Sequence, residues 1–439
     1  MSGLHHSLLN YKCQTTYLRR RIQDIDVDHG IAFSFESNTQ LCDMTIDSVE
    51  SRLLLVGSHD GHIYIFDVED PSVWSLDSVR HTSIASVCNR TKSSGLMSKG
   101  SPLVCVQWYP VDSGLFISAS ANKMLGIWDT NRLECVTSVS FAQSLSWLSM
   151  SPVACSHNLI AVSLGPCSGE SSGRAVLVDP LMGCTATTLL GSHSQSGLTQ
   201  ITWSPRAAYV VVTGGRDGRV LYWDIRFPTK PIYSLNKEND PQSDLGYSNE
   251  AIAHTGPVLG LKFSSDGLHL ISWGGSGLTV NSASLRLWTP GPGDCDQSSH
   301  IPRLRPVNFG NIVLNSESDQ LFDARNQTFT SSNSSGSGNQ SPQSSVLPIR
   351  LDTTHGSIGD LWGASSLCIF VPVKNRLLIS SASKYDTSTK IITRHFSKIR
   401  ACVWNDRHLE LYTCGADGNL FTWPILPLSS NNVIDDDQF

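Results

Sequence analysis

Charge is what this sequence has least of. Charged residues make up only 16% of the 439 residues, and acidic residues outnumber basic ones by 38 to 32. The net charge of −6 argues against a protein that binds nucleic acid through its phosphates, because such binding needs a basic surface. Hydrophobic residues make up 40% of the chain, which is enough for a large buried core. We therefore expect a globular protein that makes no direct contact with nucleic acid.

The twelve cysteines include no Cys-x-x-Cys pair. A zinc site takes its ligands from closely spaced pairs, whereas these cysteines stand singly in apolar stretches such as 104–106 and 401–403. We expect buried, reduced thiols, typical of the cytosol or nucleus, with no metal and no cofactor. The first residues lack the positively charged block and the following apolar block of a signal peptide. No apolar run reaches the ~18 residues that cross a bilayer, so no membrane contact is expected.

One unit recurs along the chain. An apolar strand ending in an aromatic residue is followed by a turn, a strand of small residues, an Asp-Gly type turn, and a strand that closes on an aromatic residue. The clear copies close on Phe66-Asp67, Trp128-Asp129, Trp223-Asp224, Trp288 and Trp423. Two degenerate copies lie at 146–178 and near 367–393. The chain therefore holds about seven units.

The spacing of these units identifies the fold. Trp128 and Trp223 are 95 positions apart with one degenerate copy between them, or about 47 per unit, near the ~40–45 of WD-type blades. Asp-Gly pairs at 60–61, 217–218 and 417–418 suit two-residue hairpin turns, because glycine readily takes a positive φ. The pattern predicts an all-β fold, a seven-bladed WD40 β-propeller, preceded by a short helical segment.

The fourth copy contains a set of polar residues at characteristic positions. His193, Thr213, Asp217 and Trp223 match the buried hydrogen-bonded tetrad of WD repeats. A catalytic interpretation, in which a histidine and a carboxylate activate a nearby hydroxyl, is the alternative. The structural interpretation is favoured because the same residue types recur in register with the repeat, and catalytic groups do not recur once per blade.

The repeat pattern divides the chain into three parts. We assign residues 1–21 to an N-terminal helical docking segment, 22–428 to the propeller, and 429–439 to an acidic tail. Inside the propeller, a Ser/Asn-rich insertion at about 311–356 is expected to be disordered. Ile22, Ile25 and Val27 suggest a strand, and a strand at this place usually completes the last blade and closes the ring. Arg19–Arg21 is a basic triplet that suits a nuclear signal or a nucleic-acid contact.

One copy ends on more than Trp-Asp. Residues 223–226 form a WDxR box, in which Arg226 lies just beyond the strand, on a rim of the predicted disc. A guanidinium group there can make planar, bidentate contacts across an interface. The alternative is an exposed arginine with no special role.

Several stretches go beyond the generic repeat. They are Val106–Pro110, Trp128–Asn131, Met150–Val153, Trp203–Arg206, Thr255–Gly256, Ser265–Leu270, Phe370–Pro372 and the acidic run Asp435–Asp437. In these stretches the chain resembles the Cockayne syndrome group A family of WD-repeat DNA excision repair factors. The likeness covers most of residues 18–290 and, more thinly, 360–437, while 311–356 is longer than in relatives.

The resemblance implies a substrate receptor of a cullin-4 RING ubiquitin ligase, acting in the nucleus in transcription-coupled nucleotide excision repair. The implied partners are the damaged-DNA-binding adaptor protein, the Cockayne syndrome group B ATPase and stalled RNA polymerase II. In the family, an N-terminal helical segment and the WDxR box contact the adaptor. Those map here to Leu4, Leu8, Leu18, Arg19 and Arg20, and to Trp223, Asp224 and Arg226.

Other functions are consistent with the same fold. A scaffold propeller of another nuclear complex, with no ligase link, is the main alternative. An enzyme would need charged residues or metal ligands clustered at the channel mouth, and the sequence indicates none beyond the repeated tetrads. We therefore expect a non-catalytic subunit, with ubiquitin transfer left to the recruited enzyme. No residue of the inter-blade loops identifies the ligand, and nothing in the insertion indicates its role.

Overall fold

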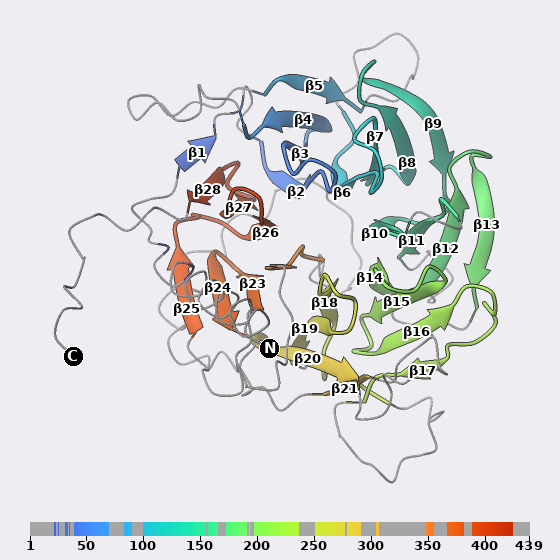
Figure 1. Cartoon of the computed structure of the whole chain (residues 1–439). Helices are drawn as coiled ribbons and strands as arrows, with labels where there is room; N and C mark the ends of the chain where they lie inside the picture. Colours follow the sequence, from blue (N-terminus) through green and yellow to red (C-terminus); the bar gives the residue numbers. More distant parts are fainter. Residues whose placement is uncertain are drawn as a thin grey trace, which may run out of the picture.

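Seven four-stranded sheets stand around a common axis, as Figure 1 shows. The computed structural model describes residues 22, 25, 31–33, 35, 39–69, 83–89, 100–153, 157–165, 173–190, 193, 197–236, 251–276, 279–290, 304–306, 348–354, 367–381 and 389–424. Within each sheet the paired strands are antiparallel. The prediction of a seven-bladed propeller is confirmed.

The blades are numbered in chain order, and each has the same four positions. The innermost strands are β2 (Leu41–Ile46), β6 (Leu103–Trp108), β10 (Leu145–Met150), β14 (Leu198–Trp203), β18 (Val258–Phe263), β22 (Asp352–Thr353) and β26 (Ile399–Asn405). The second strands are β3 (Leu53–Ser58), β7 (Leu115–Ser120), β11 (Ile160–Leu164), β15 (Val210–Gly215), β19 (Leu270–Ser276), β23 (Cys368–Val373) and β27 (Glu410–Gly415). The third strands are β4 (His62–Asp67), β8 (Met124–Asp129), β12 (Arg174–Asp179), β16 (Val220–Asp224), β20 (Thr279–Pro290), β24 (Arg376–Ser381) and β28 (Leu420–Pro424). The outermost strands are β5 (Ala85–Cys88), β9 (Glu134–Ser140), β13 (Cys184–Leu189), β17 (Tyr233–Ser234), β21 (Leu304–Pro306), β25 (Thr389–Thr393) and β1 (Ile31–Phe33).

Burial within a blade follows the distance from its outer edge. The second strand β15 is buried at all six positions and reads as a continuous apolar and small-residue run. By contrast, the outermost strand β9 is exposed at five of its seven positions. The turns between second and third strands have the expected chemistry, because Gly61, Gly218 and Gly418 take φ angles of +87°, +76° and +77°.

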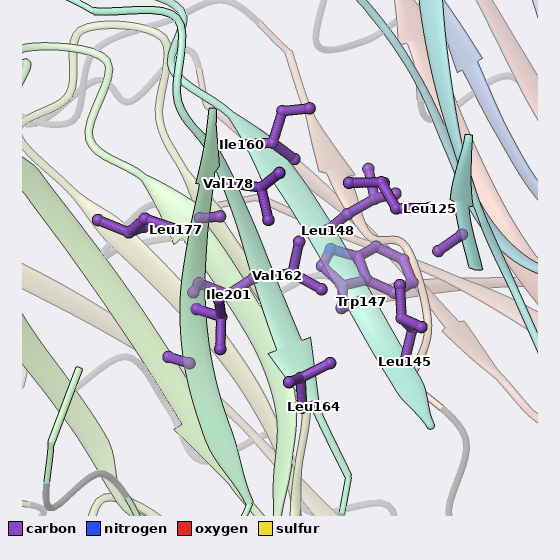
Figure 2. Close-up of a cluster of buried hydrophobic side chains, with 14 of the residues drawn as sticks. Leu125, Leu145, Trp147, Leu148, Ile160, Val162, Leu164, Leu177, Val178 and Ile201 are labelled. Atoms are coloured by element: carbon purple, nitrogen blue, oxygen red, sulfur yellow. The ribbon is translucent and has the colours of Figure 1, made fainter. Parts of the chain in front are cut away.

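The hydrophobic core lies between blades rather than within one. Figure 2 shows one cluster in which Trp147, Leu148 and Val162 of blade three lie near Leu125 of blade two and Ile201 of blade four. Each interface is therefore a sheet-on-sheet packing that neither blade can form alone. This requirement explains why the repeat must run around the whole ring.

The ring is closed by a strand from the start of the described chain. Strand β1 pairs with β28, with Ile31 opposite Thr422 and Phe33 opposite Leu420, and Figure 1 shows the two side by side. The prediction of a closing strand is thus confirmed, but its predicted position at Ile22 and Ile25 is wrong, and Val27 lies outside the described residues. Ile22 and Ile25 lie outside any strand and are buried in the core cluster that blades six and seven share.

A short strand lies inside the predicted Ser/Asn-rich insertion. Residues 348–354 fall within the insertion that we expected to be disordered, yet Leu351 is 1% exposed and β22 pairs with β23. The predicted end of the disordered insertion, at about residue 356, is therefore too far along the chain. The alternation of apolar Ile349 and Leu351 with charged Arg350 and Asp352 is the strand signal in this stretch. The residues before 348, as far back as 307, lie outside the described chain.

A ring of six hydrogen bonds and one ion pair, Lys262–Asp352, follows the inner strands and joins each blade to the next. Taken in order from blade one, the bonds are Val106 N to Asp43 Oδ2 (2.9 Å), Met150 N to Gln107 Oε1 (3.1 Å), Trp203 N to Ser149 Oγ (3.3 Å), Gln200 Nε2 to Leu259 O (3.0 Å), Lys262 Nζ to Asp352 Oδ1 (2.7 Å), Trp404 N to Asp352 Oδ2 (3.0 Å) and Asn405 Nδ2 to Ser51 O (2.9 Å). These bonds fix the register of each blade against its neighbours.

Arg350 lies at the centre of this ring. Its guanidinium group donates through Nε and Nη2 to the two carboxylate oxygens of Asp43, both at 2.7 Å, and through Nη2 to Val106 O at 3.0 Å. The same group lies 5.0 Å from the ring centre of Trp147. One side chain from blade six thus contacts blades one, two and three.

The backbone around Arg350 reaches the remaining blades. Arg350 N donates to Arg400 O, and Arg350 O accepts from Cys402 N, both at 3.0 Å, in blade seven. Ile349 N donates to Leu259 O of blade five, and Ile349 O accepts from Gln200 Nε2 of blade four. Two consecutive residues therefore connect blade six to the other six blades.

We predict that Arg350→Met lowers the free energy of unfolding by about 3–5 kcal/mol, because it leaves the Asp43 carboxylate, 1% exposed, without its charge partner. Urea unfolding followed by tryptophan fluorescence measures this. The double variant Asp43→Asn/Arg350→Met should lose less than the two single changes added together. Lys262→Met, which removes a half-exposed cation, is the control and should cost about 1 kcal/mol or less. Equal losses in Arg350→Met and Lys262→Met would contradict the prediction.

Candidate functional site

The WDxR residues form the turn between the third and outermost strands of blade four. Trp223 and Asp224 end β16, and Arg226 follows in the turn. Trp223 is fully buried, and the Asp224 side chain is 9% exposed. Neither residue can form much of an interface, whereas the Arg226 side chain is 52% exposed. Of the three adaptor-binding residues predicted in this box, only Arg226 reaches solvent.

Arg226 is held rigidly in this turn. Its Nε lies 2.9 Å from Asp224 Oδ1, and its Nη2 lies 2.6 Å from Asp224 Oδ2, so the pairing is bidentate. The backbone N of Arg226 also donates to Asp224 Oδ1. The guanidinium carbon lies 4.9 Å from the ring centre of Tyr209, which stacks against it. Because Nε and Nη2 are both bonded to Asp224, Arg226 presents the planar face and the outer edge of its guanidinium group to a partner.

The electrostatics of the pair favour its charged form. Burial raises the pKa of Asp224, but the hydrogen bonds and charge of Arg226 together outweigh burial, so the pKa lies below its ordinary value. The hydrogen bonds that Arg226 donates to Asp224, together with the negative charge of Asp224, raise the pKa of Arg226. The turn is therefore a fixed ion pair at neutral pH.

Two aromatic side chains flank Arg226, and sequence reasoning missed both. Tyr209, from the turn between β14 and β15, is 37% exposed, and Phe227 is 68% exposed. Ile225 N donates to Tyr209 O at 3.0 Å, which holds the two turns together. The signal for Phe227 was an aromatic residue directly after the WDxR box. Tyr209 had no such signal, because its place depends on pairing between strands.

Asp67 of blade one provides a matched comparison. Arg52 pairs with it in the same bidentate manner, through Nε at 3.0 Å and Nη2 at 2.5 Å. Arg52 is 45% exposed, close to the exposure of Arg226. In the described part of the chain no aromatic ring stacks against Arg52, whereas Tyr209 stacks against Arg226. The stacked aromatic residue therefore distinguishes the Arg226 turn.

The predicted tetrad residues of blade four come together. His193 Nδ1 lies 2.8 Å from Asp217 Oδ1, and His193 Nε2 lies 3.0 Å from Thr213 Oγ1. Trp223 Nε1 donates to the same Thr213 oxygen at 3.0 Å. Burial raises the pKa of Asp217, but the bond and charge of His193 lead the interactions that lower it below its ordinary value. The network ties the loop before β14 to the third strand.

The order Asp217–His193–Thr213 matches that of a hydrolase triad, but its surroundings do not. Thr213 has no exposed surface, so no substrate can reach its hydroxyl oxygen. The same arrangement recurs in blade seven with His395, Asp417 and Thr413, where Trp423 donates to Thr413. This recurrence supports the structural interpretation over the catalytic one.

Blade five carries a variant network without a carboxylate. His254 Nε2 lies 2.7 Å from Ser272 Oγ, which also accepts from Trp288 Nε1 at 2.8 Å. His254 Nδ1 lies 3.0 Å from Ser284 Oγ, a hydroxyl where blades four and seven have aspartate. Burial, reinforced by the charge of Arg286, lowers the pKa of His254 to about 3. His254 is therefore a neutral hydrogen-bonding group.

The remaining predicted site residues lie outside the described chain. They are Leu4, Leu8, Leu18, Arg19 and Arg20. Among the residues that the structure does describe, no three histidine, cysteine or acidic side chains gather as metal ligands. In the same part of the chain, no helix has the length and apolar character to span a membrane.

Comparisons with known proteins agree with this architecture. The family model described as "WD domain, G-beta repeat" matches residues 183–224, which run from β13 to the WDxR turn. Along 92% of its length the chain is 24% identical to the Arabidopsis thaliana WD repeat-containing protein ATCSA-1, covering 89% of that protein. It is 26% identical to Radiation-sensitive protein 28 of Saccharomyces cerevisiae over 43% of the chain and 38% of that protein. It is 30% identical to the ribosome biogenesis protein YTM1 of Phaeosphaeria nodorum over 29% of the chain and 25% of that protein.

We predict that stability falls between pH 6.5 and pH 5 and that His254→Gln flattens this fall. The folded pKa of about 3 lies below the ordinary 6.5, so the unfolded chain takes up the proton first and stability is lost as pH drops. The loss reaches about 2 kcal/mol at about pH 5. Urea unfolding across this range measures it, with the exposed His59→Gln as control. An unchanged slope in His254→Gln would refute the assignment.

Proposed function

We propose that this chain, a WD40-repeat protein, is a substrate receptor of a cullin-4 RING ubiquitin ligase. It docks on the damaged-DNA-binding adaptor protein and acts in the nucleus in transcription-coupled nucleotide excision repair. The observation that carries the proposal is the Arg226 turn, which combines a WDxR box with a rigid, half-exposed guanidinium group. The similarity to ATCSA-1 along nearly the whole chain supports it.

The docking surface that we propose centres on Arg226, Tyr209 and Phe227. Asp224 and Trp223 position this surface from below, since both are buried. A rigid aromatic and guanidinium surface loses little entropy on binding, and such residues are enriched among interface hot spots. The partner surface would lie flat across the stacked pair. The N-terminal segment 1–21 would supply the second part of the docking site.

Catalysis has no place in this function. The His–Asp networks are buried structural groups, and the receptor would bring a bound substrate to the enzyme that transfers ubiquitin. The Cockayne syndrome group B ATPase and stalled RNA polymerase II are the partners that the family likeness proposes. A repair role also agrees with the similarity to Radiation-sensitive protein 28.

A scaffold propeller in another nuclear complex is the second candidate. The similarity to YTM1, whose name refers to ribosome biogenesis, favours this second candidate. That similarity extends over 29% of this chain and 25% of YTM1. The two candidates differ in one simple observation. A ligase receptor co-migrates with the purified adaptor in size-exclusion chromatography, whereas a scaffold of another complex does not.

We predict that Arg226→Ala weakens adaptor binding about tenfold or more, because it removes the planar group at the centre of the docking surface. Surface plasmon resonance with immobilised adaptor measures the change. Arg52→Ala removes the equivalent guanidinium group in blade one, which pairs with Asp67, and should leave adaptor binding unchanged. Circular dichroism checks that both variants remain folded.

Deletion of residues 1–21 tests the second part of the docking site and should also weaken binding. If Arg226→Ala and this deletion both leave adaptor binding at the level of the original chain, the receptor function is wrong. If Arg52→Ala weakens binding as much as Arg226→Ala, the docking surface is misplaced although the function stands.

A further inference from the structure

Phe396 is the most exposed large hydrophobic side chain in the described part of the chain, at 85%. It lies in the connection from β25 to β26, between blades six and seven. Its backbone N donates to Asp417 Oδ2 at 2.9 Å, beside the His395–Asp417 pair. The blade-seven network therefore holds Phe396 in place, while its ring points away from the protein core.

The backbone around Phe396 is fixed on both sides. Ile399 N donates to Lys374 O at 2.6 Å, which ties the connection to the turn between β23 and β24. Ala416 N donates to Lys398 O at 2.8 Å, which ties it to the turn between β27 and β28. The three loops thus lie together on the same face of the propeller. This face is opposite the Arg226 turn, because the turns after second strands and after third strands leave a blade at opposite ends.

These loops carry an excess of positive charge. Four cationic residues lie in or next to them, and with Phe396 they define the cationic patch: Lys374, Arg376, Arg394 and Lys398. Lys398 is exposed and the other three are partly exposed. Asp417 is the acidic residue of these loops, and it is engaged by His395. Asp406 and Glu410 belong to the opposite end of blade seven.

Arg394 connects this charge to the aromatic core. Its guanidinium carbon lies 4.9 Å from the ring centre of Phe421 and 5.9 Å from that of Trp423. The stack restricts the partly exposed side chain, which precedes Phe396 by two residues, so that its charge does not sample many rotamers. A fixed cation beside a fixed, exposed ring is a preformed recognition surface.

We propose that the cationic patch binds an acidic linear segment of a partner protein, with an apolar side chain of that segment packed on Phe396. The basic residues before and after Phe396 in the chain, Arg394 and Lys398, complement carboxylates on both sides of the apolar residue. A nucleic acid fits less well, because the patch is small and the chain as a whole carries a net charge of −6. The inference uses blades six and seven alone and does not depend on adaptor docking.

The test uses the full chain and a fluorescein-labelled peptide in which aspartates and glutamates flank a single tryptophan. Fluorescence anisotropy should show saturable binding that weakens as salt rises. Lys398→Glu and Phe396→Ser should each weaken binding about tenfold. The control for charge is Arg132→Glu, and the control for exposed apolar surface is Leu181→Ser, at 83% exposure in blade three. Neither control should alter binding.

Three outcomes would overturn the proposal. One is peptide binding that survives both Lys398→Glu and Phe396→Ser. A second is tighter binding of a single-stranded oligonucleotide than of the peptide at the same patch. A third is a gain in peptide affinity when Asp435, Asp436 and Asp437 are changed to asparagine, which would make the chain's own tail the occupant. Adaptor binding should stay constant in Lys398→Glu, which separates this test from that of the receptor function.

Discussion

The ion pair of Arg350 with Asp43 is the interaction on which the architecture most depends. Each blade is a small sheet with too little core to stand alone, so the disc must be stable as a whole. The bonds between inner strands join neighbours, whereas within the described part of the chain the segment at 349–350 alone connects blade six to all the other blades. A charge pair enclosed in this position also favours one arrangement of the ring, because a shift of blade one against blade six would leave the buried Asp43 carboxylate without its charge partner.

The parts of the fold that were predictable are those that recur. The closing tryptophans, the Asp-Gly turns and the His193 set appear in register with the repeat. The role of a residue in one copy therefore predicts the role of its counterpart in the next. The errors lie where a strand is short and its neighbours are polar. Strand β22 has two residues, and the closing strand at Ile31–Phe33 has three. So few residues give too weak an alternation to separate a strand from a loop, because pairing with distant partners determines them.

The WDxR turn was likewise predictable only in part. Its position follows from the sequence, because Arg226 comes two residues after a strand that ends in Trp-Asp. The hydrogen bonding of Arg226 does not follow from the sequence. Whether its guanidinium group is free or paired within the turn depends on where the Asp224 side chain points. The stack on Tyr209 brings together residues from two different turns. Only the register of β14, β15 and β16 places them in contact.

Closure by β1 also constrains the order in which the molecule can assemble. Strand β1 leaves the ribosome before the other described strands, but its partner β28 leaves after all of them. Until synthesis reaches residue 420, the N-terminal edge of blade one has no neighbour and β1 has no sheet to join. Such an unpaired strand invites wrong association in a nascent chain. A chaperone that shields this edge during translation would therefore decide how much of the protein reaches the closed state.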